Sequence, residues 1–81
     1  MKKYTYRIHL DPEPEGGSAV TVPALPGCVT WGEDYDHALA MAREAVEGYL
    51  KVLAEAGKPI PEESVAAPVD TLIQVESPAV A

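Results

Sequence analysis

The sequence predicts an α+β domain in which a four-stranded sheet carries one main helix on one face. Four short segments have strand character, and a single long amphipathic segment separates the third from the fourth. At 81 residues the chain has room for one domain, and we expect it to span 1–81 with an ordered core from about 3 to 76. Because one helix covers only one side of a sheet, we expect the other side to be left open and to be of interest for function.

The first two predicted strands form a long hairpin. Residues 4–10 alternate apolar or aromatic side chains with polar ones, which is typical of a half-buried strand, and Asp11-Pro12 ends it. The prolines and the Gly16-Gly17 pair that follow favour a turn back into a second strand over Ala19–Val22. Pro23 ends this strand because proline cannot donate a ladder hydrogen bond.

A tight turn and a short third strand come next. Leu25-Pro26-Gly27-Cys28 has proline and glycine at the two central positions of a type II turn. The third strand is predicted over Cys28–Trp31, with Val29 and Trp31 on one face, and Gly32 ends it.

One long helix follows the third strand. Asp34 can cap a helix that starts at Tyr35, and Gly57 can end it. Residues at spacings of three and four give it one apolar stripe, which we expect to cover the sheet. The stripe consists of Leu39, Ala42, Val46, Tyr49, Leu50 and Leu53.

The last quarter of the chain is predicted to hold one strand. Lys58–Pro68 contains three prolines without a period, which favours an ordered surface connection. The β-branched segment Thr71–Val75 is the predicted fourth strand, and Ser77–Ala81 is expected to be a frayed tail.

Charge excludes several classes of function. Thirteen acidic and six basic residues give a net charge of −7 and a pI near 4.5, which argues against direct nucleic-acid binding by this chain. No apolar run is long enough to span a bilayer, and the first ten residues lack the apolar region of a secretory leader. We therefore expect a cytoplasmic protein without membrane contact.

The small size of the chain favours association with other subunits. A chain of this length buries only about 60% of its surface on folding. Its single Cys28 excludes an internal disulfide, and no Cys/His cluster offers a zinc site. We expect a homo-oligomer, a dimer or higher, or a complex with a partner, and no cofactor.

Several segments in combination resemble the HicB family. They are a tyrosine-rich first strand, Val20-Thr21-Val22-Pro23-Ala24-Leu25-Pro26-Gly27-Cys28, Thr30-Trp31-Gly32-Glu33-Asp34, Ala38-Leu39 with Ala42, and Gly57-Lys58-Pro59-Ile60-Pro61. The resemblance covers roughly residues 4–75, nearly the whole chain. It implies a truncated ribonuclease-H-like domain with strand order 3-2-1-4.

The resemblance also implies a partner. HicB proteins are antitoxins that sequester HicA, a small basic ribonuclease with a double-stranded-RNA-binding fold. Typical members add a C-terminal DNA-binding segment, whereas this sequence stops after its fourth predicted strand, so we expect no repression of an operon by this chain alone. An acidic surface would attract a basic toxin, so charge and resemblance agree on a HicA-like partner whose active site this chain covers.

Four residues are the candidates for partner binding. Asp11, Glu13 and Glu15 are expected to be steering charges in an exposed hairpin loop, and Trp31 is expected to be an interface anchor, with a place in the core as the alternative. Both the acidic rim and the open sheet face are plausible docking surfaces. The side chains of Tyr4 and Tyr6 share one face of the first strand and lie either under the helix or on the open face.

Two other functions remain as alternatives. The chain could be a homo-oligomeric binding module without a toxin, or a metal-dependent nuclease that uses the carboxylates Asp11, Glu33, Asp34 and Asp70. We expect no catalysis, because Asp11 precedes a proline at a turn, Asp34 suits a helix cap, and the remaining acids are spread over the surface.

The histidines and the cysteine are also expected to be non-catalytic. His9 alternates outward from the first strand, which favours a polar face or a partner contact, and His37 has no neighbour in sequence that completes a nucleophile pair or a metal set. Cys28 is expected to be a small buried hydrophobic residue that reacts slowly.

Overall fold

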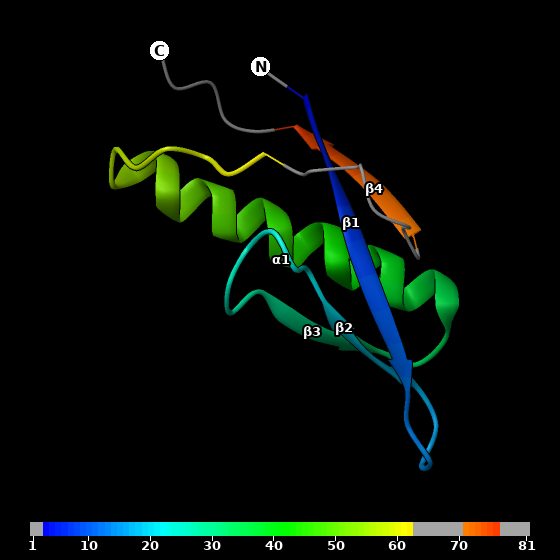
Figure 1. The fold of residues 1–81 in the computed structure, drawn as a ribbon. Helices are drawn as coiled ribbons and strands as arrows, with labels where there is room; N and C mark the ends of the chain where they lie inside the picture. Colours follow the sequence, from blue (N-terminus) through cyan, green and yellow to red (C-terminus); the bar gives the residue numbers. More distant parts are fainter. Residues whose placement is uncertain (1–2, 63–70, 77–81) are drawn as a thin grey trace.

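The computed structural model describes residues 3–62 and 71–76. Four strands and one helix follow one another along the chain (Figure 1). They are β1 (Lys3–Pro12), β2 (Ser18–Thr21), β3 (Val29–Gly32), α1 (Tyr35–Glu55) and β4 (Thr71–Glu76). The predicted α+β class and the single main helix are confirmed.

The sheet is antiparallel throughout, and its strand order is β3-β2-β1-β4, as the resemblance implied. β1 makes this order possible because its ten residues pair with two different neighbours. Residues 3–8 pair with β4, and residues 9–12 pair with β2. The β1–β2 turn then extends past the helix at one end of the sheet (Figure 1).

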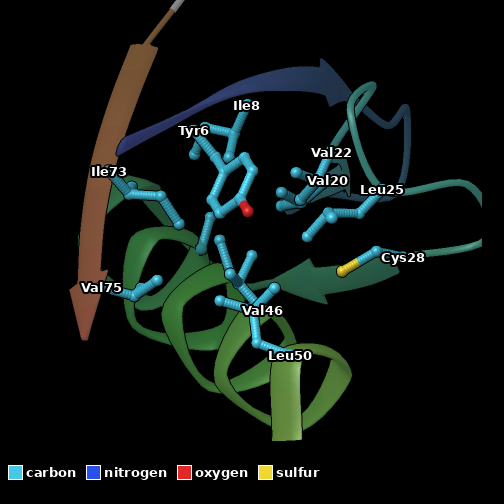
Figure 2. Packing of buried hydrophobic residues seen from close by; sticks show 12 residues of the cluster. Tyr6, Ile8, Val20, Val22, Leu25, Cys28, Val46, Leu50, Ile73 and Val75 are labelled. Carbon is cyan, nitrogen blue, oxygen red and sulfur yellow. The ribbon is translucent and has the colours of Figure 1, made fainter. Parts of the chain in front are cut away.

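The helix packs on one face of the sheet and closes the hydrophobic core between them (Figure 2). The core side of the helix is formed by Ala38, Ala42, Val46 and Leu50, all of which are fully buried. The strands contribute apolar side chains at every second position, as expected for a sheet with one covered face. These are Tyr6 and Ile8 from β1, Val20 from β2, and Ile73 and Val75 from β4.

The helix stripe differs in part from the prediction. Leu39, Tyr49 and Leu53 are only half-buried, while Ala38, which was not predicted, is fully buried. Ala38 lies against Gly32 of β3, where an added Cβ would be 2.3 Å from the Ala38 Cα. The close approach of strand and helix at this point requires two small residues, and periodicity alone does not reveal it.

Both predicted ends of the helix are confirmed. The Asp34 carboxylate accepts a hydrogen bond from the His37 N–H at 2.8 Å, which satisfies a free amide of the first turn. The His37 Nδ1 in turn accepts a hydrogen bond from the Glu33 N–H at 2.9 Å. After the last turn Gly57 adopts a φ of 68°, and the Lys58 N–H bonds the Leu53 carbonyl at 2.9 Å.

The predicted strand boundaries shift by one or two residues. The predicted turn at Leu25–Cys28 forms, and because the Cys28 N–H bonds the Leu25 carbonyl, Cys28 belongs to the turn and β3 begins at Val29. At the other end of the hairpin, β1 continues through Pro12, which pairs with Ser18.

Some predictions fall on residues outside the described ranges. These are the part of the predicted connection beyond residue 62, the predicted tail at 77–81, and Asp70. In the described part of the chain, no helix combines the length and the apolar character needed to cross a membrane.

Candidate functional site: the open face of the sheet

The face of the sheet opposite the helix carries the candidate site. Alternation along each strand places on this side the residues between the buried ones. We call this surface the open face. Its residues are Lys3, Thr5, Arg7, His9 and Asp11 from β1, Ala19 and Thr21 from β2, Val29 and Trp31 from β3, and Leu72 and Gln74 from β4.

Trp31 and Asp11 lie in one row across the open face. Ala19 is the cross-strand partner of both, so their Cα atoms are two strand spacings, about 10 Å, apart. The Trp31 side chain is 42% exposed, which places it on the surface and outside the core. Its indole lies against Gly17 in the hairpin turn, where an added Cβ would be 2.2 Å from Trp31 Cζ2. Gly17 therefore leaves the space in which the indole rests.

A second row crosses the same face beside the first. His9, Thr21 and Val29 are successive cross-strand partners. His9 Nε2 lies 3.5 Å from Asp11 Oδ1, so the two rows are linked along β1. Val29 is 65% exposed next to Trp31 on the same strand. The two side chains give the β3 end of the open face an apolar character.

The acidic residues are divided between this face and the adjoining turn. Asp11 was predicted in a loop at a turn, but it lies within β1 and pairs with Ala19, because the hairpin ladder extends to Pro12. Glu13 and Glu15 are exposed in the turn itself, as predicted. The turn is held by hydrogen bonds from the Glu13 N–H to the Gly17 carbonyl and from the Gly16 N–H to the Glu13 carbonyl, both at 3.0 Å.

Charge varies along the open face. Lys3 and Arg7 occupy the end where β1 pairs with β4, and Asp11 occupies the end where β1 pairs with β2. The acidic turn extends from that second end, beside Trp31. The hairpin end of the open face is therefore its acidic end.

The residues considered for catalysis have structural positions. Asp34 caps the helix, and His37 accepts the Glu33 amide. Cys28 is buried, and this burial raises the pKa of its thiol above the ordinary value of 9.0, as a slowly reacting cysteine requires. Within residues 3–62 and 71–76, no three His, Cys, Asp or Glu side chains are grouped so that they could hold a metal ion.

Sequence reasoning missed two members of the site. It did not single out Val29, although the alternation of Val29 with Trp31 was already visible, and it did not place Leu72 outward from the fourth strand. Leu72 is 45% exposed and pairs with Arg7 across the sheet. The missing information was the strand pairing, which brings residues 7 and 72 together.

A groove of about 420 Å³ runs between the outer edge of β3 and the helix. We call it the β3–α1 groove. It is lined by Gly27, Cys28, Val29 and Thr30 on the strand side and by Met41, Glu44, Ala45, Gly48, Tyr49 and Val52 on the helix side. The hydroxyl of Tyr49, one of the lining residues, donates a hydrogen bond to the Pro26 carbonyl at 2.9 Å.

The fold defines the class of the protein, because it is shared with solved antitoxin domains. The N-terminal domain of the Burkholderia pseudomallei antitoxin HicB superposes with a TM-score of 0.70 at 27% identity, over 93% of this chain and 99% of that one. The longer structure of the same antitoxin gives a TM-score of 0.66 at 28% identity. That match covers 94% of this chain, which spans 63% of the longer antitoxin.

The sequence comparisons identify the family. Residues 6–78 match the model of the HicB-like antitoxins of bacterial toxin–antitoxin systems, and the chain belongs to that family. A UPF0150 protein of Synechocystis sp. is 33% identical over 60 residues, which are 74% of this chain and 76% of the relative. A UPF0150 protein of Thermoplasma acidophilum is 34% identical over 59 residues, which are 73% and 86% of the two chains.

Proposed function

We propose that this chain is an antitoxin that binds a small basic HicA-like ribonuclease and inhibits it by covering its active site. It acts in the cytoplasm, without catalysis and without contacting nucleic acid itself. Membership of an antitoxin family supports the existence of a toxin partner. The observation that carries the proposal is the open face, where exposed apolar side chains adjoin an acidic turn.

Trp31 and the acidic turn have different roles in this proposal. An interface needs a desolvated anchor, and Trp31 is a half-exposed aromatic side chain that packs against Gly17. Glu13 and Glu15 are exposed, so they contribute long-range attraction more than contact energy. The ribonuclease must be basic to hold RNA, and it therefore meets the hairpin end of the open face first.

We also propose that the chain self-associates without covering the open face. The small hydrophobic core favours association, as argued from chain length. Self-association of this kind leaves the open face accessible to the toxin.

An inhibition assay tests the proposed function. A small basic HicA-like ribonuclease is purified, and its cleavage of RNA is measured while the chain is added. We expect cleavage to be lost at excess chain. Trp31→Ala should weaken inhibition by about thirtyfold, the effect of losing an interface hot spot. Tyr35→Ala is the matched control, because Tyr35 is a 57% exposed aromatic residue outside the open face, and it should inhibit like the wild type.

Charge reversal separates steering from anchoring. Glu13→Lys with Glu15→Lys should slow association, and the difference from the wild type should shrink as salt is added. Glu55→Lys, an exposed acid at the far end of the helix, is the control. Undiminished RNA cleavage at excess wild-type chain would contradict the proposal.

A further inference from the structure

The outer edge of β3 is an unprotected sheet edge. Among the described residues, β3 has β2 on one side and no strand on the other. Natural proteins protect such edges with lysine, proline, a bulge or a covering segment. The β3 residues Val-Thr-Trp-Gly include no charge and no proline, and two of the large exposed hydrophobic residues, Val29 and Trp31, lie on this strand.

The ladder with β2 determines which backbone groups face outward. The Val22 N–H donates to the Cys28 carbonyl at 3.1 Å, so these residues occupy a hydrogen-bonded position at the end of the ladder, with one bond only because the Cys28 N–H bonds the Leu25 carbonyl in the turn. Such pairs alternate with non-hydrogen-bonded pairs in an antiparallel ladder, which makes Val20 and Thr30 the next hydrogen-bonded pair. The N–H and C=O groups of Val29 and Trp31 are therefore directed to the outer edge.

We propose that this edge pairs with β3 of a second copy, antiparallel, around a two-fold axis at Thr30. Val29 of one copy then lies opposite Trp31 of the other, and each of these two pairs makes two backbone hydrogen bonds. The inference rests on the self-association proposed above and does not depend on the toxin. It assigns that association to a surface and gives it a register.

The side chains at this edge are complementary to themselves. In the proposed register a β-branched residue faces an aromatic one twice on the open face, a favourable cross-strand combination. β3 carries no charge, and the acidic turn lies between β1 and β2, so the paired strands of two chains of charge −7 bring no like charges together. Glu44 is the one charged residue in the lining of the groove beside them. An uncharged edge offers no electrostatic attraction to a strand of a basic, non-identical partner, so the second copy is the better match.

The β3–α1 groove gives the second copy room on the helix side. Ala45 and Gly48 are small residues of its helical wall, and Val52 beside them is 64% exposed. A two-fold axis perpendicular to the sheet keeps both helices on one side. The two open faces then join on the other side, with Val29 of each copy beside Trp31 of its neighbour, and the toxin-binding surface is extended.

Cysteine cross-linking tests the register. In a Cys28→Ala background, Thr30→Cys places two thiols at the proposed axis, in a non-hydrogen-bonded pair whose Cα atoms are about 4.5 Å apart, within the range of a disulfide. Mild oxidation should convert most of the chain to a covalent dimer. Thr5→Cys in the same background is the control, since β1 is an inner strand, and it should stay monomeric on a denaturing gel. Equal cross-linking of both variants would overturn the inference.

A proline variant tests the edge without a cross-link. Val29→Pro removes an outward N–H but leaves the hydrogen bonds to β2 in place, since proline is tolerated where its nitrogen faces away from the ladder. Sedimentation should show a dimer for the wild type and for Val29→Ala, and a dissociation constant raised by at least about tenfold for Val29→Pro. Circular dichroism verifies the fold of each variant. If Val29→Pro does not fold, the cross-linking experiment alone tests the pairing.

The outcomes separate this inference from the proposed function. A chain that forms the Thr30→Cys dimer but leaves RNA cleavage undiminished supports the pairing and contradicts the toxin proposal. A wild-type chain that is monomeric at high micromolar concentration overturns the pairing, even if that monomer inhibits the toxin. If that monomer loses inhibition on Val29→Pro and keeps it on Val29→Ala, the backbone edge receives a strand of the toxin instead, which also overturns the pairing.

Discussion

The two faces of the sheet are built from alternating residues of the same strands, yet they differ in what they do. β1 contributes Tyr6 and Ile8 to the covered face, where both are fully buried, and Arg7 and His9 to the open face. The covered face contacts the helix and holds the fold together. The open face has no layer over it among the described residues, so its side chains can change without loss of the fold.

Neighbouring residues of β4 give the largest expected contrast between the faces. Ile73 is 3% exposed in the core, and Leu72 is 45% exposed on the open face. Ile73→Ala should lower the free energy of unfolding by about 2–5 kcal/mol, because it leaves a cavity in the core. Leu72→Ala should change it by no more than about 0.5 kcal/mol. Urea unfolding followed by circular dichroism measures both, and equal losses would mean that the two faces are not distinct in stability.

Two tyrosine hydroxyls are expected to differ, by a smaller amount, in what their hydrogen bonds contribute to the free energy of unfolding. The Tyr6 hydroxyl donates a hydrogen bond to the Pro61 carbonyl at 2.5 Å from within the core, whereas the Tyr49 hydroxyl bonds the Pro26 carbonyl at an exposed site. Tyr6→Phe should cost about 1 kcal/mol, since a part-buried carbonyl loses its partner. Tyr49→Phe should cost less than about 0.5 kcal/mol, because water replaces the hydroxyl. Thermal unfolding of the two variants ranks them, and a larger loss for Tyr49→Phe would reverse the assignment.

Most of the fold could be predicted from the sequence because its signals are local. The cap at Asp34 and the glycine stop at Gly57 determine the helix within one turn at either end. Alternation in β1 determines which side chains share a face. Strand order is different, because it depends on pairing between distant segments, and here it came from the family resemblance and not from the local pattern.

The candidate site could be predicted only in part. Glu13 and Glu15 were placed correctly in an exposed turn, because prolines and glycines mark that turn in the sequence. The position of Asp11 within β1 and the row that joins it to Trp31 depend on how far the hairpin ladder extends. The sequence did not decide between an exposed and a buried Trp31 for a similar reason, since a single aromatic residue can lie on either face of the sheet until its cross-strand neighbours are known.

The reactivity of cysteine gives the finest contrast between the faces. Cys28 is buried among core residues, and desolvation raises the pKa of its thiol above 9.0. Because the thiolate is the reactive form, a thiol reagent at neutral pH should label Cys28 much more slowly in the folded chain than in urea. In the Cys28→Ala background, Thr5→Cys on the open face is only half-buried and should react much faster than folded Cys28 does.

The same raised pKa predicts a small effect of pH on stability. Well below pH 9.0 the thiol is protonated in both the folded and the unfolded chain, so its contribution is complete. As pH rises further, the unfolded chain loses this proton first, and the free energy of unfolding falls until the folded thiol also ionises. Cys28→Ala should remove this part of the alkaline loss, which urea unfolding at pH 8 and pH 10 can measure. An unchanged alkaline loss in the variant, or rapid labelling of folded wild type, would show that the covered face is open to solvent near Cys28.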